Sequence, residues 1–185
     1  MRFDPVRIPT GALGGFLLAG LASGAVAGDT RSVSLVTQDG APVAVAELKV
    51  DGDGRYALRW DESKFGDFFL SMRPFRCLEG AEKLWCRLPY PYENRRRLSD
   101  GDLVDLEYDL MFVWKNAGEY GIDFWNGVYY RLSAGADGAL TGAMHEIDMN
   151  VLAAPPSEGD LRPIAPDMLE EADPSSHWLP RLRIE

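Results

Sequence analysis

The chain has few of the residues that most often carry out chemistry. Among its 185 residues there are only two cysteines, Cys77 and Cys86, and two histidines, His145 and His177. Protein metal sites are usually built from closely spaced cysteine and histidine ligands, and these four residues form no such group. No serine motif precedes His145, so a hydrolytic triad built on it lacks support. We predict no metal, no cofactor and no catalytic residue, and the sequence does not indicate an enzyme.

Positive charge is also scarce. The 19 lysines and arginines are outnumbered by 29 aspartates and glutamates, which gives a net charge of −10. Proteins that bind nucleic acids or anionic membranes usually show the opposite excess. We therefore exclude nucleic acid as a partner and read the acidic excess mainly as a source of solubility.

Long apolar runs are missing after the first residues. Residues 11–22 are apolar and follow a short segment with Arg2 and Arg7, and Ala25-Val26-Ala27 then supplies the small residues of a signal-peptidase site. The alternative is an uncleaved anchor, but the run is shorter than the roughly 20 residues that span a bilayer as a helix. We interpret residues 1–27 as a cleaved signal peptide. This predicts a periplasmic or secreted protein without integral membrane insertion.

The rest of the chain fits one β domain, residues 28–154, with a C-terminal extension, residues 155–185. Six of the twelve prolines lie in that extension. Residues 43–50 and 55–60 read as strands joined by Asp51-Gly52-Asp53-Gly54, a sequence typical of a tight hairpin. The same four residues begin like a calcium loop, but Arg55 and Tyr56 then stand where a ligand and a glycine are required.

Two further segments alternate over a long distance. In residues 104–114 the even positions are apolar and three of the odd positions are acidic, which predicts a long strand with a buried face and an acidic, wet face. Residues 140–153 alternate too, and the phase places His145 with Ile147 and Met149 on the inner face. With about eight or nine strands, we predict an all-β fold: a single antiparallel meander barrel, which we favour, or a sandwich. Acidic outer faces argue against a barrel in the outer membrane.

The two cysteines are predicted to form a disulfide. They are separated by eight residues with the turn-like centre Gly80-Ala81-Glu82-Lys83, so they can face each other across a hairpin. An exported chain enters an oxidising compartment, where two cysteines most simply pair.

The candidate ligand-binding residues are His145, Tyr90, Tyr92, Arg95, Arg96 and Arg97. His145 is either a core histidine or a polar anchor at the bottom of a cavity. The three arginines form either a solvated loop or a contact for an anion, since guanidinium groups fit such ligands. The two tyrosines next to them could add a flat contact surface. His177 is expected to be solvated.

Two functions remain open on the sequence alone. The first is a non-enzymatic periplasmic binding protein for a small amphipathic or anionic ligand. The second is an envelope interaction or structural protein that docks on another envelope protein without a small ligand. A cavity that reaches His145 would favour the first, and a filled core with an exposed apolar patch would favour the second.

Overall fold

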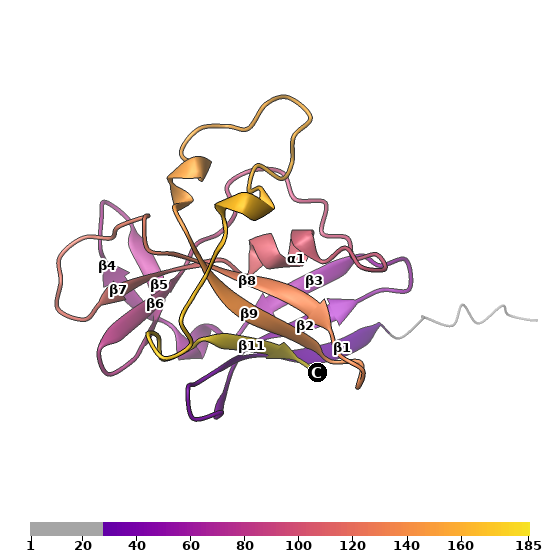
Figure 1. The fold of residues 1–185 in the computed structure, drawn as a ribbon, viewed down its shortest axis with the longest axis horizontal. Helices are drawn as coiled ribbons and strands as arrows, with labels where there is room; N and C mark the ends of the chain where they lie inside the picture. Colours follow the sequence, from indigo (N-terminus) through magenta and orange to yellow (C-terminus); the bar gives the residue numbers. More distant parts are fainter. Residues whose placement is uncertain (1–27) are drawn as a thin grey trace, which may run out of the picture.

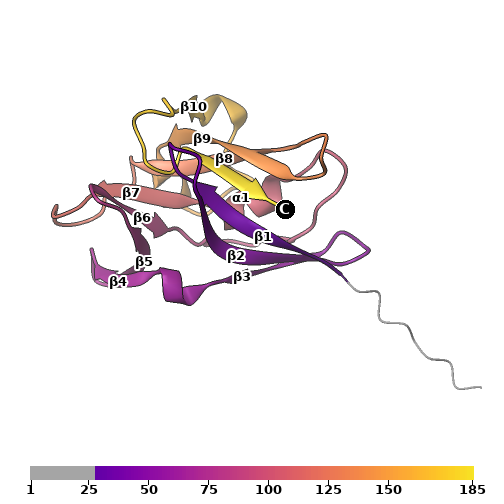
Figure 2. The same ribbon diagram turned by 90° about the horizontal axis from the view of Figure 1, so that it is seen from below.

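The computed structural model describes residues 28–185, and its strands form one antiparallel sheet that curls into a half-barrel (Figures 1 and 2). The strand order is β3-β2-β1-β11-β9-β8-β7-β6-β5-β4, and β10 pairs with β9 outside this path. The all-β prediction is confirmed. The predicted signal peptide, residues 1–27, lies outside the described residues.

The strands are β1 (Asp29–Val36), β2 (Pro42–Val50), β3 (Tyr56–Trp60), β4 (Gly66–Phe69), β5 (Pro74–Glu79), β6 (Lys83–Arg87), β7 (Phe112–Asn116), β8 (Gly127–Ala134), β9 (Leu140–Ile147), β10 (Glu170–Glu171) and β11 (Arg181–Ile184). The helices are all short: α1 (Val104–Asp109) and the 3-10 turns η1 (Glu62–Lys64), η2 (Met149–Leu152) and η3 (Pro166–Met168). The two edge strands, β3 and β4, follow each other in the chain and are joined through η1.

The predicted β2–β3 hairpin is present. Gly54 in its turn has a φ of +81°, a conformation that glycine adopts without strain. A Cβ at this position would lie 2.3 Å from the backbone oxygen of Leu98, so a side chain is excluded there. The Leu98 amide in turn donates to the Gly54 carbonyl over 2.8 Å. The segment before α1 is thereby attached to the start of β3.

The concave side of the sheet is filled with large side chains. Trp85, Phe112 and Tyr130 are fully buried there among branched aliphatic residues. The indole N–H of Trp85 donates to the Tyr130 hydroxyl over 3.2 Å, and that hydroxyl donates to the Leu179 carbonyl over 2.7 Å. The polar atoms that these aromatic rings bring into the core are therefore satisfied.

The predicted long strand over residues 104–114 is wrong. Its first half is the helix α1, which lies between the β1–β3 arm and β8 (Figure 2), and only its second half is a strand, β7. Leu106 and Leu110, one helical turn apart, enter the main core, while Tyr108 belongs to a second buried cluster with Tyr129 and Ile147. The apolar even positions of residues 104–110 therefore pack in two different clusters on different sides of the helix. In the sequence they resemble the single buried face of a strand.

The acidic face predicted for this segment is also wrong, since Asp105 and Glu107 are both only 5% exposed. Each carboxylate has fixed partners. Glu107 accepts from the Tyr129 hydroxyl over 2.5 Å and from the Leu132 amide over 2.6 Å, so it satisfies a backbone donor of β8. Burial raises the pKa of the Glu107 carboxyl above its ordinary value.

In the second alternating segment, the predicted phase is wrong for residues 140–145, whereas Ile147 and Met149, also predicted to face inward, are buried in the second cluster. β9 ends at Ile147, and η2 follows. Its core-facing residues are Leu140, Gly142 and Met144, whereas the side chain of His145 is half-exposed outside the core clusters. Gly142 explains the misreading, because a Cβ there would lie 3.1–3.2 Å from Leu132, Tyr130 and Leu182. The core-facing side of β9 thus includes a glycine, which an alternating pattern of hydrophobic residues does not reveal.

The proline-rich extension is woven into the sheet. β11 pairs with β1 on one side and with β9 on the other, in the middle of the strand order. The extension also buries Ile164, Ala172 and Leu179. His177, which we expected to be solvated, is only 3% exposed, so that expectation is wrong.

The predicted disulfide is confirmed. Cys77 and Cys86 face each other across β5 and β6, with their Cα atoms 3.9 Å apart and both side chains fully buried. Such short separations belong to the pairs in an antiparallel ladder that are not hydrogen-bonded to each other.

Candidate functional site: an arginine-lined hollow

A surface hollow of about 400 Å³ lies next to the disulfide hairpin, and its charge is opposite to that of the chain as a whole. Its lining residues are Arg73, Pro74, Phe75, Arg76, Arg87, Pro89, Tyr90 and Pro91. Three of these are arginines, and none of the lining residues in the described part of the chain is acidic. We call this site the arginine hollow.

The hairpin geometry brings two of the arginines together. Cys77 pairs with Cys86, so extending the same register by one residue sets Arg76 opposite Arg87. Like charges placed directly opposite each other destabilise a sheet. The fold compensates with Glu62 of η1, whose two carboxylate oxygens accept from Arg76 Nε over 3.2 Å and from Arg87 Nη1 over 2.9 Å. Glu62 therefore holds two guanidinium groups side by side.

Arg87 is further fixed by aromatic rings. Its guanidinium carbon lies 4.7 Å from the ring centroid of Trp60 and 4.9 Å from that of Phe65. Cations are attracted to the faces of aromatic rings, and the attraction grows as water is excluded. Only 15% of the Arg87 side chain is exposed. Its orientation is therefore set before any ligand arrives.

Arg73 and Arg76 differ in how fully they are neutralised. Arg76 also pairs with Asp67 over 3.0 Å, and this hydrogen bond is the main cause that raises its pKa above the ordinary value. Arg73 forms no ion pair with any residue in 28–185. The hollow therefore contains one uncompensated cation beside two that share Glu62.

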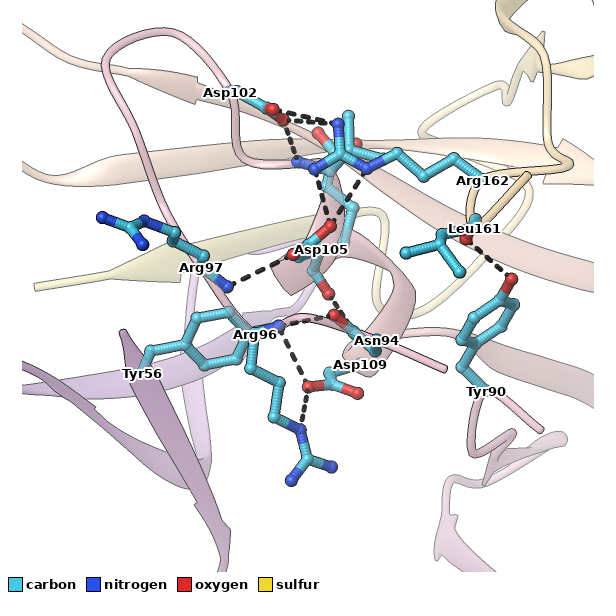
Figure 3. A network of polar contacts seen from close by, with 12 residues as sticks. Tyr56, Tyr90, Asn94, Arg96, Arg97, Asp102, Asp105, Asp109, Leu161 and Arg162 are labelled. Atoms are coloured by element: carbon cyan, nitrogen blue, oxygen red, sulfur yellow. Dashed lines mark hydrogen bonds and ion pairs between the residues drawn. The ribbon is translucent and has the colours of Figure 1, made fainter. Parts of the chain in front are cut away.

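The opposite wall is formed where the chain leaves the sheet. Leu88 makes the last backbone bond, to Met111 over 3.0 Å, and Pro89 and Pro91 then lack the donors that would continue a strand. Tyr90, between the prolines, packs with its ring centroid 4.5 Å from that of Tyr108 and donates its hydroxyl to the Leu161 carbonyl over 2.8 Å (Figure 3).

A smaller hollow of about 170 Å³ shares Arg87, Pro89 and Tyr90 with the arginine hollow and adds Arg96 and Asp109. Arg96 Nε donates to Asp109 Oδ2 over 3.1 Å, and the Tyr56 hydroxyl donates to the same oxygen over 3.0 Å (Figure 3). Arg96 has a φ of +51°, which is costly for a residue with a side chain. Asn94 Oδ1, which accepts from the Arg96 amide over 2.9 Å, helps to hold this conformation.

The network in Figure 3 fixes the loop that carries Arg96. Arg162 from the C-terminal extension reaches Asp105 over 2.6 Å and Asp102 over 2.9 Å. The second oxygen of Asp105 accepts from the Arg97 amide over 3.2 Å. The hydrogen bond from Arg162 is the main cause that lowers the pKa of the Asp102 carboxyl. Through Arg162 and Asp105, the C-terminal extension thereby helps to position the loop that carries Arg96 and Arg97.

An apolar hollow of about 210 Å³ adjoins both. It shares Pro89 and Pro91 with the arginine hollow and is otherwise lined by Leu88, Phe124, Met149, Asn150, Leu152 and Ala153. Cationic and apolar surfaces therefore meet at one short segment, residues 88–91.

The six predicted ligand residues are not gathered at one place. Tyr90 lines both cationic hollows and Arg96 lines the smaller one. Tyr92 donates its hydroxyl to the Leu152 carbonyl over 2.7 Å, so it anchors η2. Arg95 and Arg97 are exposed and line neither cationic hollow, and His145 lines none of the three hollows.

The sequence reading missed Arg73, Arg76 and Arg87. One signal was available: Arg76 and Arg87 are the residues next to the two cysteines, on the same side of the predicted pairing. The disulfide alone therefore implied that two arginines face each other. Glu62 offsets the repulsion between these two arginines. It lies in η1, and the sequence pattern did not indicate that this turn reaches the hairpin.

A second buried polar cluster surrounds His177. Lys83 Nζ lies 3.2 Å from His177 Nδ1, and Glu146 Oε1 lies 3.0 Å from Nε2. Because an ammonium group can only donate, Nδ1 is the acceptor and Nε2 carries the proton that Glu146 accepts. Trp85 and Trp114 pack against the ring. Lys83 Nζ also donates to the Ser176 carbonyl over 2.8 Å, so these contacts tie the C-terminal extension to β6 and β9.

Within residues 28–185 there is no group of three or more histidine, cysteine, aspartate or glutamate side chains that could hold a metal ion. None of the helices in the same residues has the length and apolar character to cross a membrane. No family model matches this chain, and comparisons with curated proteins and with solved structures found no similar protein.

Proposed function

We propose that this protein is an exported, non-enzymatic binding protein for a small amphipathic anion, which it holds at residues 88–91 on its surface. The observation that carries the proposal is the arginine hollow: three guanidinium groups around aromatic and proline side chains in a chain of net charge −10. A carboxylate, phosphate or sulfate group fits such donors, since guanidinium forks bind oxyanions in bidentate fashion.

The apolar hollow accounts for the other half of the ligand. It adjoins the arginine hollow through Pro89 and Pro91, so an anionic head among the arginines leaves an attached alkyl or aryl group beside Phe124 and Leu152. Ligand sites typically combine apolar walls with a few placed polar groups. The filled core supports an outer site and gives no support to one at His145.

Titration calorimetry with dodecyl phosphate, below its micelle concentration, tests this proposal. We expect saturable binding by the unaltered protein. Because a hydrogen bond to a charged group contributes about 1.5–3 kcal/mol, Arg73→Gln should weaken binding by roughly tenfold or more. Arg73 has no ion pair to lose in residues 28–185, so the variant leaves the fold intact. Arg87→Lys, which keeps the charge and removes the planar fork, should also weaken it.

Arg55→Gln is the matched control, since Arg55 is an exposed arginine that lines none of the three hollows. Its affinity for dodecyl phosphate should equal that of the unaltered protein. Dodecanol tests the anionic head and should not bind measurably. The proposal fails if dodecyl phosphate does not bind, or if Arg73→Gln and Arg55→Gln bind it equally well.

A further inference from the structure

Four large apolar side chains project into solvent at the β4–β5 and β7–β8 turns. Phe69, the last residue of β4, and Met72, in the β4–β5 connection, are 75% and 101% exposed, and Tyr120 and Trp125, in the β7–β8 connection, are 98% and 70% exposed. We call these four residues the apolar tip. Isolated exposed apolar residues are normal on protein surfaces, but a contiguous group marks an interaction site.

The two loops lie at the same end of the molecule in both views (Figures 1 and 2). They also touch. Phe68 near the end of β4, Leu70 in the β4–β5 loop and Ile122 in the β7–β8 loop pack on one buried cluster around Cys77 and Cys86. A Cβ at Gly121 would lie 4.0 Å from the Leu70 carbonyl oxygen. The four projecting residues therefore belong to one surface.

The β7–β8 loop is held in shape by contacts beneath the tip. Asp123 accepts from the Trp125 amide over 3.0 Å, and its carbonyl accepts from the Asn126 amide over 3.2 Å. Asn116 donates to the Glu119 carboxylate over 2.8 Å, and the buried Lys115 donates to the Glu119 carbonyl. The exposed rings take no part in these bonds. The β7–β8 loop thus presents Tyr120 and Trp125 without needing their rings for its own shape.

The residue types and a neighbouring charge indicate the partner. Tryptophan, tyrosine and phenylalanine are favoured at the boundary between lipid headgroups and acyl chains, where one end of a ring meets water and the other meets apolar groups. Arg73 directly follows Met72 and has no carboxylate partner in the described chain. Once Met72 enters the boundary region, Arg73 lies at the level of the lipid phosphates, which guanidinium groups bind well.

We propose that the apolar tip docks this protein on the surface of a phospholipid bilayer, with its four side chains in the interface and Arg73 on a phosphate. The tip is distinct from the apolar hollow, and Arg73 is the one residue of the proposed contact that also lines the arginine hollow. Because the four apolar side chains make the contact, the proposal stands without the proposed function. Its driving force is apolar burial, because a chain of net charge −10 gains nothing from an anionic surface. Binding to zwitterionic lipid should therefore be at least as strong as binding to anionic lipid.

Co-sedimentation with phosphatidylcholine vesicles tests this, followed by the same assay with phosphatidylglycerol added. The unaltered protein should pellet with the vesicles. Phe69→Ser combined with Met72→Ser, and separately Trp125→Ser, should lower the bound fraction at least about fivefold, since each removes apolar area from the contact. Met168→Ser is the matched control: Met168 is 44% exposed but lies on η3, outside the tip, and its loss should change nothing.

Tryptophan fluorescence gives an independent reading. Trp125 is the exposed tryptophan of the described chain, so its emission should shift to shorter wavelength when vesicles are added, and Trp125→Ser should abolish the shift. Thermal melting should show that the tip variants remain folded, and they should still bind dodecyl phosphate.

Three results would overturn the proposal. The first is that the unaltered protein remains in the supernatant. The second is that the tip variants and Met168→Ser bind vesicles equally well. The third is a dimer in solution that the tip variants dissociate, without vesicle binding, which would assign the tip to a second copy of the chain.

Discussion

His177 donates its Nε2 proton to Glu146 across 3.0 Å, and this contact joins the C-terminal extension to β9 inside the half-barrel. The ring is 3% exposed, and Lys83 on β6 occupies its other nitrogen. Burial is the main cause that lowers the pKa of the His177 imidazole, and the charge of Lys83 adds to it, while Glu146 and Asp173 oppose it. The neutral ring is therefore the form that the fold selects.

The first prediction concerns pH. A base whose pKa is lower in the folded state adds stability above its unfolded value of 6.5, and that contribution is lost as the pH falls through the folded-state pKa. The free energy of unfolding should therefore fall from pH 7 towards pH 5 more steeply in the unaltered protein than in His177→Gln, measured by urea denaturation at each pH. Equal slopes would contradict this.

The second prediction concerns Glu107. Its replacement by alanine leaves the Tyr129 hydroxyl and the Leu132 amide without an acceptor, which should lower the free energy of unfolding by about 2–4 kcal/mol. Glu107→Gln keeps one acceptor and should cost less than half as much. Because burial raises the pKa of Glu107, its contribution is largest below the ordinary value of 4.5 and declines as the pH rises through the folded-state pKa.

Denaturant unfolding of both Glu107 variants near pH 5 and near pH 8 measures these differences. The cost of Glu107→Gln should be smaller at the higher pH. A variant Glu107→Ala as stable as the unaltered protein would show that these two hydrogen bonds contribute nothing.

The third prediction compares two arginines of similar exposure. The Arg162 and Arg183 side chains are 37% and 39% exposed, but Arg162 pairs with Asp105, whose side chain is 7% exposed, whereas the partners of Arg183 are exposed. Removing one member of a buried pair leaves an uncompensated charge. Arg162→Ala should cost about 1–3 kcal/mol and Arg183→Ala less than about 1 kcal/mol. Differential scanning calorimetry of the two variants measures this difference in stability. Equal melting temperatures for Arg162→Ala and Arg183→Ala would contradict the prediction.

The fourth prediction concerns the Cys77–Cys86 disulfide. Replacing Cys77 and Cys86 together by alanine should lower the free energy of unfolding by about 2–3 kcal/mol, because the disulfide restricts a short loop in the unfolded chain. Alkylation of the unaltered protein without reduction should label neither cysteine. Labelling of both would show that the bond is absent in solution.

The sequence predicted what depends on local chemistry. The turn at Asp51–Gly54 and the spacing of the two cysteines indicated hairpins that are present, because turn geometry and disulfide reach are set by neighbouring residues. The fold class followed from the same short-range signals.

The wrong predictions of burial have one cause in common: each depended on a contact with residues far away in the sequence. Asp105 and Glu107 were predicted to be solvated, but Arg162 and Tyr129, which are distant in the sequence, bind their carboxylates and allow them to be buried. Gly142 of β9 faces the core but is not counted as hydrophobic, so the inward face was assigned to the wrong residues. His177 was predicted to be solvated, but it is buried with Glu146 as its partner. In the candidate site, Tyr90 and Arg96 were named from composition. Arg76 and Arg87 become a site only through Glu62, and no periodicity encodes that contact.

The place of β11 has a consequence for the order of events in folding. β1 to β3 and β4 to β9 are two separate ribbons that share no ladder, and only β11 bridges them, through β1 on one side and β9 on the other. A ribosome reaches Arg181 after both ribbons have been synthesised. Until then the chain cannot close its sheet, however well each hairpin forms. This topology therefore postpones closure of the sheet until residues 181–184 have been synthesised.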